Sequence, residues 1–137
     1  MNRNERFEAL AIADPAPLMA LGEQLLESLT PDEHTVQTGS LMLRLREPVA
    51  DDLFNMGELL VTEASVLLAG ARGYAMRLGL DIEATLAAAL IDAAAEVGHP
   101  LRPQIDALLE GAVHAERARR RAKWNEVAGT SVVFDEM

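Results

Sequence analysis

The chain has 137 residues, with 12 Lys and Arg against 22 Asp and Glu, and it contains no cysteine. This length suits one domain with one hydrophobic core, and the 50 % hydrophobic and 25 % charged residues are typical of a folded globular protein. The formal net charge of −10 disfavours nucleic acid and anionic membranes as partners, because both bind cationic surfaces. Without cysteine, the chain offers no thiol nucleophile, disulfide or thiolate metal ligand.

Residues 1–29 predict two helices, because apolar residues recur at helical spacing on both sides of Asp14-Pro15. Asp14 suits a helix N-cap, and Pro15 suits the first helical position, where its missing N–H is not needed. The first residues lack the apolar core of a signal peptide, and the longest apolar run, near residues 84–95, is too short to cross a bilayer. These features predict a soluble, cytoplasmic protein.

Residues 35–79 predict an antiparallel sheet. Leu41, Leu43 and Leu45 alternate with Met42, Arg44 and Arg46, which is typical of a strand with one buried and one solvent-exposed face. Thr38-Gly39 before this strand predicts a turn that follows a short partner strand at 35–37, and residues 47–52 predict a loop. A second strand at 58–68 has apolar residues on both faces and is expected to be covered on both. A hairpin turn at 69–73 leads into a third strand at 74–78.

Residues 81–128 predict two further helices. Asp81 suits the N-cap of the first, whose expected buried face carries Ile82, Leu86, Leu90, Ala93 and Val97. Gly98-His99-Pro100 breaks that helix, and a longer one is expected from near Pro103 to about Val127, with Gly129 as its stop. Residues 130–137 favour a short terminal strand or extended arm.

The fold class predicted is α+β: an antiparallel β-meander flanked by helices, with a long C-terminal helix and a short terminal strand or arm. The chain is expected to form one domain over residues 1–137. Its parts are the helical segment 1–29, the sheet 35–79, the helices 81–128 and the strand or arm 130–137.

Residue patterns with catalytic spacing are scarce. His34, His99 and His114 fall in three different elements, and no glycine pattern forms a phosphate loop. Asp51-Asp52 is expected in a solvated loop. Thr62, Glu63 and Ser65 share one strand without forming a set of nucleophile, base and orienting group, so a structural role is favoured. We therefore predict no catalytic, metal-binding or cofactor-binding residue in this chain, and we keep Arg44, Arg46 and Arg77 as candidate anion contacts on a solvent-exposed sheet face.

The most unusual feature is a basic run of Arg117, Arg119, Arg120, Arg121 and Lys123, which contains no acidic residue. One interpretation is a solvated helix end, where cations are favourable near the C-terminus. The other is a docking helix, because Arg binds carboxylate or phosphate through a planar fork and Trp124 can anchor in a partner's pocket. The residues predicted at a partner interface are Arg117, Arg120, Arg121, Trp124, Val132, Phe134 and Met137.

Several segments, in this order and spacing, resemble the PhnG family, the small G subunit of the bacterial carbon–phosphorus lyase core complex. The segments that carry the resemblance span residues 37–46, 54–64, 73–81, 87–92 and 130–137. They read QTGSLMLRLR, FNMGELLVTEA, GYAMRLGLD, AAALID and TSVVFDEM. The resemblance covers nearly the whole chain, although residues 1–30 match only in helical character.

The resemblance implies a noncatalytic subunit in phosphonate catabolism, with H-, I- and J-type subunits as partners. In that complex the adenine of ATP is exchanged for a phosphonate, giving a ribose 1-phosphonate 5-triphosphate, so ATP is a substrate of the complex and not a cofactor of this chain. Carbon–phosphorus cleavage, with its iron–sulfur cluster, is attributed to the J subunit, which agrees with the absence of cysteine here. Two alternatives stay open: a free-standing enzyme acting on a small anion, and an acidic protein-binding module. Self-association also stays open.

Overall fold

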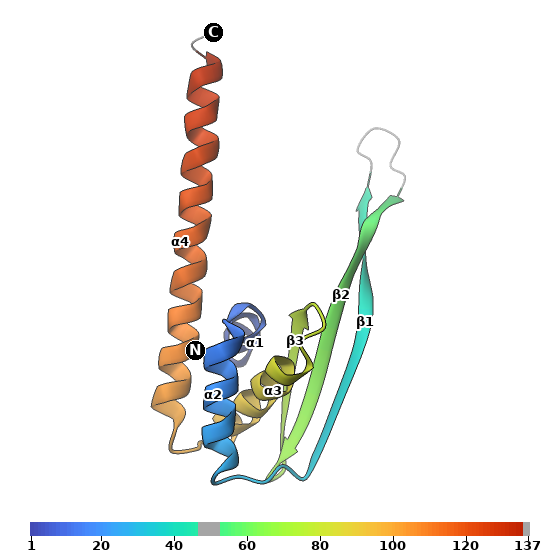
Figure 1. Ribbon diagram of the computed structural model, residues 1–137, viewed down its shortest axis with the longest axis vertical. Helices are drawn as coiled ribbons and strands as arrows, with labels where there is room; N and C mark the ends of the chain where they lie inside the picture. Colours follow the sequence, from blue (N-terminus) through green and yellow to red (C-terminus); the bar gives the residue numbers. More distant parts are fainter. Residues whose placement is uncertain (47–52, 136–137) are drawn as a thin grey trace.

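The computed structural model describes residues 1–46 and 53–135, with side chains described for residues 1–42 and 57–127 (Figure 1). In these ranges the chain forms helices α1 (Arg3–Ile12) and α2 (Pro15–Leu26), then strands β1 (Glu33–Arg46), β2 (Leu53–Leu68) and β3 (Ala71–Leu78), and finally helices α3 (Ile82–Glu96) and α4 (Arg102–Asp135). The strands form one antiparallel sheet in the order β1-β2-β3. The α+β class, the antiparallel meander and the long C-terminal helix are confirmed.

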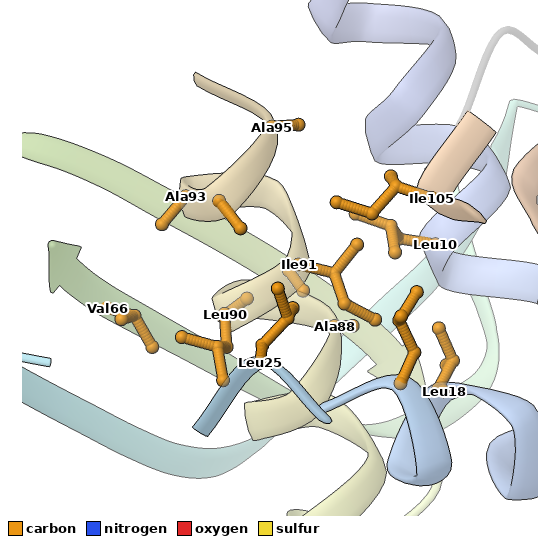
Figure 2. Packing of buried hydrophobic residues seen from close by; sticks show 14 of the residues in the cluster. Leu10, Leu18, Leu25, Val66, Ala88, Leu90, Ile91, Ala93, Ala95 and Ile105 are labelled. Atoms are coloured by element: carbon orange, nitrogen blue, oxygen red, sulfur yellow. The ribbon is translucent and has the colours of Figure 1, made fainter. Parts of the chain in front are cut away.

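The helices lie on one side of the sheet (Figure 1). α3 packs directly on β2 and β3, α2 packs on α3, and α1 contacts both β3 and α4. The core contains six large side chains that are all fully buried, including Leu109 of α4. Figure 2 shows the other five, which are Leu10, Leu18, Leu25, Ile91 and Ile105. The second strand was expected to be covered on both faces, but the face with Glu63, Ser65 and Leu67 is only half-buried.

The helix starts follow the local sequence. Pro15 occupies the first turn of α2 as predicted, although the side chain of Asp14 makes no capping hydrogen bond. Asp81 does cap α3, since its carboxylate accepts a hydrogen bond from the N–H of Ala84 at 3.1 Å. Ile82 and Val97, at the two ends of this helix, were expected to be buried but are 45 % and 38 % exposed, because only the middle of α3 lies over the sheet.

β1 corrects two expectations. Thr38 and Gly39 form no turn but pair with Thr62 and Val61 inside one 14-residue strand. The 16-residue β2 supplies a partner for the whole of β1, and this outweighs the weak β propensity of glycine. Leu41, expected on a buried face, is 46 % exposed, because the β1–β2 hairpin extends beyond the helices that cover β3 (Figure 1). The predicted loop at residues 47–52 lies outside the described residues.

The C-terminal segment is the largest correction. Residues 130–135, expected as a strand or arm, continue α4, and Gly129 does not stop the helix. A glycine inside a helix costs about 1 kcal/mol, and β-branched residues cost less than that each, whereas extending an existing helix requires no new nucleus. The Ala- and Arg-rich turns that precede Gly129 therefore propagate through it. α4 and the β1–β2 hairpin both project from the body of the molecule in the same direction (Figure 1).

α3 approaches β3 closely because small residues face each other. Gly73 is buried against Ala89 and Ala93, and a Cβ placed on Gly73 would lie 2.5 Å from the Ala93 nitrogen and nearer still to the Ala89 carbonyl oxygen. Both of these atoms belong to the helix backbone, so relief would require the whole of α3 to move away from the sheet. The alanines of α3 thus set the distance between the two layers.

We expect Gly73→Ala to lower the free energy of unfolding by about 1–3 kcal/mol or more, since overpacking against backbone cannot be relieved by a side-chain rotation. Gly39→Ala is the matched control, because nothing lies within 4 Å of a Cβ at that strand position. Urea unfolding followed by circular dichroism measures both. Equal stability of the two variants would contradict the close contact.

Candidate functional site

A buried ionic cluster joins α1, α3 and β3. Asp92 of α3 accepts a hydrogen bond from Nε of Arg6 at 2.6 Å and another from the backbone N–H of Tyr74 at 2.9 Å. Arg6 also donates to Glu96, and Arg3 lies 3.4 Å from Asp92. The side chains of Arg6 and Asp92 are only 4 % and 3 % exposed. Burial alone would lower the pKa of Arg6, but its hydrogen bonds to Asp92 and Glu96 hold that pKa above its ordinary value.

This cluster is structural, because its donors and acceptors bind one another and the backbone. Arg3 donates to the carbonyl oxygen of Arg72, so a second cation of α1 is also tied to β3. The same hydrogen bond from Arg6 lowers the pKa of Glu96, which keeps that carboxylate ionised opposite the guanidinium. Among the described residues, no buried side-chain nitrogen or oxygen lacks a hydrogen-bond partner. Sequence reasoning missed this cluster, since a single Arg at helical spacing gives no signal of burial.

A second polar cluster lies on the sheet face turned away from α3. Glu63 accepts hydrogen bonds from the hydroxyl of Tyr74 and the amide of Gln37, while Arg72 donates to Ser65 at 2.7 Å. The hydrogen bond from Tyr74 is the main cause that lowers the pKa of Glu63, and the same bond raises the pKa of Tyr74 to about 12. These are cross-strand pairs that stabilise the sheet.

The neighbouring Thr62 is fully buried, and its hydroxyl donates to the carbonyl oxygen of Gly79 at 2.8 Å. Thr62, Glu63 and Ser65 therefore have structural partners, as the sequence analysis favoured.

The three histidines lie apart. His34 is exposed on β1, and His99 is in the turn between α3 and α4, where its Nδ1 accepts from the N–H of Leu101 at 3.0 Å. His114 lies on α4 beside α1. Within the described residues no group of three or more His, Asp or Glu side chains is arranged to hold a metal ion. Asp51-Asp52 lies outside the described residues.

The candidate anion contacts on the sheet are separated. Arg77 is half-buried and its Nη1 donates to the carbonyl oxygen of Leu10 at 2.6 Å, so it ties β3 to α1. Burial lowers its pKa from the ordinary value. Arg77 pairs with Thr62 on β2, whereas Arg44 pairs with Asn55, and at about 3.3 Å per residue these positions lie roughly 20 Å apart along the strand. The side chains of Arg44 and Arg46 are outside the described set, so their contact with an anion stays a prediction.

The basic run identified in the sequence lies on the half of α4 that leaves the body. Ile105 and Leu109 at the base of this helix are fully buried, Val113 is half-buried, and every side chain from Arg117 to Val127 is exposed. Trp124 is 69 % exposed. Because all their side chains are exposed to solvent, we call residues 117–127 the free segment of α4. The backbone of Val132 and Phe134 continues this helix, their side chains are not described, and Met137 lies outside the described residues, so their place in an interface stays a prediction.

A hollow of about 900 Å³ lies at the base of the free segment, between α1 and α4. The acids along it come from both helices: Glu5 and Glu8 from α1, and Glu110 and Glu116 from α4. Arg117 and Arg120 line its upper end. Glu116 pairs with Arg119 at 2.9 Å and with Arg120 at 3.3 Å. Such exposed pairs within a helix contribute only a few tenths of a kcal/mol, so these cations are held loosely.

Sequence reasoning also missed the apolar surface of the hairpin. Leu41 and Leu59 form a cross-strand pair, and Ser40 pairs with Leu60. Successive residues of a strand point to opposite faces, so Leu59 and Leu60 expose apolar surface on both sides of the hairpin, at 37 % and 54 % exposure. The sequence does contain consecutive apolar residues at Leu59 and Leu60, but this pattern predicted a strand buried on both faces within this chain.

These features define a class: a two-layer α+β protein whose described buried polar groups serve the fold and whose hairpin and helix expose side chains suited to contacts between proteins. A family model described as "Phosphonate metabolism protein PhnG" matches residues 1–137. The chain therefore belongs to the PhnG family of phosphonate metabolism proteins. A search of curated proteins found no match. Within the described residues, no helix combines the length and apolar composition needed to cross a membrane.

We expect Asp92→Asn to lower the free energy of unfolding by about 3–5 kcal/mol, because it leaves the buried guanidinium of Arg6 without its main counter-charge. The control is Asp106→Asn, which removes the exposed pair of Asp106 with Arg102 and should cost no more than about 1 kcal/mol. Chemical denaturation of the two variants compares the two costs. Similar losses would show that the buried cluster is not a main support of the fold.

Tyr74 is the single tyrosine of the chain, so tyrosinate absorbance reports on it alone. We expect its titration midpoint near pH 12, and we expect Glu63→Gln to move it toward the ordinary value of 10. Because the folded pKa is raised, this hydrogen bond stabilises the fold fully below pH 10 and loses its effect as the pH rises through 12. Glu58→Gln, an exposed change on the same strand, should leave the midpoint in place. An unshifted midpoint in Glu63→Gln would contradict the pairing.

Proposed function

We propose that this chain is a noncatalytic subunit of a carbon–phosphorus lyase core complex. It would support the exchange of the adenine of ATP for a phosphonate by partner subunits, the activity of an alpha-D-ribose 1-methylphosphonate 5-triphosphate synthase. The proposed partners are H-, I- and J-type subunits, and the proposed location is the cytoplasm. ATP would be bound by the complex through residues of other subunits.

The observation that carries the proposal is the match of the PhnG family model to residues 1–137. The use of polar residues in the described structure agrees with a noncatalytic role. Arg6, Asp92 and Arg77 hold α1 against α3 and β3, and Glu63 and Tyr74 bind each other across the sheet. Each of these five side chains has a hydrogen-bond partner within the chain, so none of them is left as an unpaired acid, base or nucleophile.

The exposed apolar side chains support a role in an assembly. Leu41, Met42, Leu59 and Leu60 occur together on the projecting hairpin, each at least 37 % exposed. Exposed apolar patches on one part of a surface mark sites of protein contact more often than chance. The hairpin therefore supports the proposal independently of the family match.

The test is co-expression of the tagged chain with the other subunits encoded by a phosphonate operon. We expect the tagged chain to recover the I-type subunit and the recovered complex to consume ATP and a phosphonate together, while the chain alone shows no turnover. Release of adenine, measured by chromatography, follows the reaction. Recovery of the chain by itself, or turnover by the chain without partners, would contradict the proposal and favour a free-standing protein.

A further inference from the structure

We propose that the free segment of α4, residues 117–127, is a docking helix that binds an acidic protein surface of a partner subunit, with Trp124 inserted into an apolar pocket of that surface. The inference rests on the proposed function, since it assigns the place on this chain where a subunit of the complex binds. It adds the face of the helix, the chemistry of the partner surface and the anchoring residue.

The first support is that every side chain of the free segment is exposed, so this part of α4 buries no apolar face in the chain itself. Val113 is the last half-buried apolar residue of α4 that the structure describes, and Trp124 is 69 % exposed. Most of the stability of protein helices comes from packing an apolar face against a neighbour, and isolated helices of this length are marginal in water. A helix that leaves the body and exposes a tryptophan is therefore suited to gain its packing from another chain.

The second support is charge complementarity. The free segment contains five cations, Arg117, Arg119, Arg120, Arg121 and Lys123, and one acid, Glu126, whereas the rest of the chain has seven cations and 21 acids. Two of the cations share the single carboxylate of Glu116, and their side chains remain 63 % and 79 % exposed. A surface that presents carboxylates would neutralise this charge, and Arg pairs with carboxylates through two parallel hydrogen bonds.

The third support is the arrangement of side chains around the helix. At 3.6 residues per turn, Arg117, Arg120, Trp124 and Val127 fall on one stripe, and Arg121 lies at its border. The stripe continues the line of Leu109 and Val113, which packs on the body lower down. Arg119 lies outside this stripe, about 160° around the helix from Arg117. Trp and Arg are both enriched among the residues at the energetic centre of protein interfaces.

A protein partner fits better than nucleic acid or a second copy of this chain. The hollow below the stripe is bordered by Glu5, Glu8, Glu110 and Glu116, which would repel a polyphosphate backbone running past the segment. Two copies, each with a net charge of −10, repel one another at long range. A folded partner can place its carboxylates at the level of the arginines and keep them away from these glutamates.

The experiment uses the complex assembled by co-expression, with a tag on the I-type subunit, and measures how much of this chain is recovered. We expect Trp124→Ala to lower recovery at least tenfold, because removing an interface anchor commonly costs that much in affinity. The double variant Arg117→Glu/Arg121→Glu should lower it by a similar factor. Arg119→Glu is the control, since it reverses one arginine charge outside the stripe and should leave recovery near wild type.

Recovery of all variants at the wild-type level would overturn the docking helix and leave the proposed function intact. Failure of the wild-type chain itself to assemble would instead contradict the proposed function. Loss of recovery after nuclease treatment of the wild-type complex would overturn the inference in favour of nucleic acid. Light scattering of the purified chain separates the remaining case, because a dimer that Trp124→Ala converts to monomer would assign the stripe to a second copy. Circular dichroism of each variant checks that the helices are retained.

Discussion

The buried carboxylate of Asp92 is the interaction on which the arrangement of the molecule depends. It lies on α3 and binds both Arg6 of α1 and the backbone N–H of Tyr74 on β3, so one side chain fixes three elements. α1 in turn packs against α4 through the cluster that contains Leu10, Ile105 and Leu109. The same ion pair therefore holds in place the helix against which the base of α4 packs.

The use of charge in this chain divides into two kinds. The buried Arg6 and the half-buried Arg77 bind groups within the chain and hold α1 against α3 and the sheet. Exposed cations, gathered between Arg117 and Lys123, contribute little to the stability of the isolated chain, because solvent screens their pairs with Glu116. This division, with inner charges paired inside the fold and other charges exposed on a projecting helix, fits the role in an assembly that we propose for this member of the PhnG family.

The sequence predicted elements well where a local chemical signal acts alone. Pro15 marks the start of α2, and Asp81 marks and caps the start of α3, because both effects depend on a single residue and the next turn of backbone. Prediction failed where residues with the composition of a turn or a helix stop were overridden by the strand or helix around them. Thr38-Gly39 has turn composition and still extends a strand, since β2 offers it a partner along its whole length. Gly129 has the composition of a helix stop and is passed by a helix already formed.

The sequence by itself determined the class of the fold, the position of most helices and strands, the basic run of α4 and the family, because these depend on periodicity, capping and the order of segments. Only the tertiary structure decided that Arg6 and Asp92 meet in the interior and that Arg77 serves α1. It also decided that Leu41 and Leu60 are exposed and that the basic run stands clear of the body. Each of these depends on which elements cover one another, and burial is a property of packing between segments distant in the chain, which no local pattern encodes.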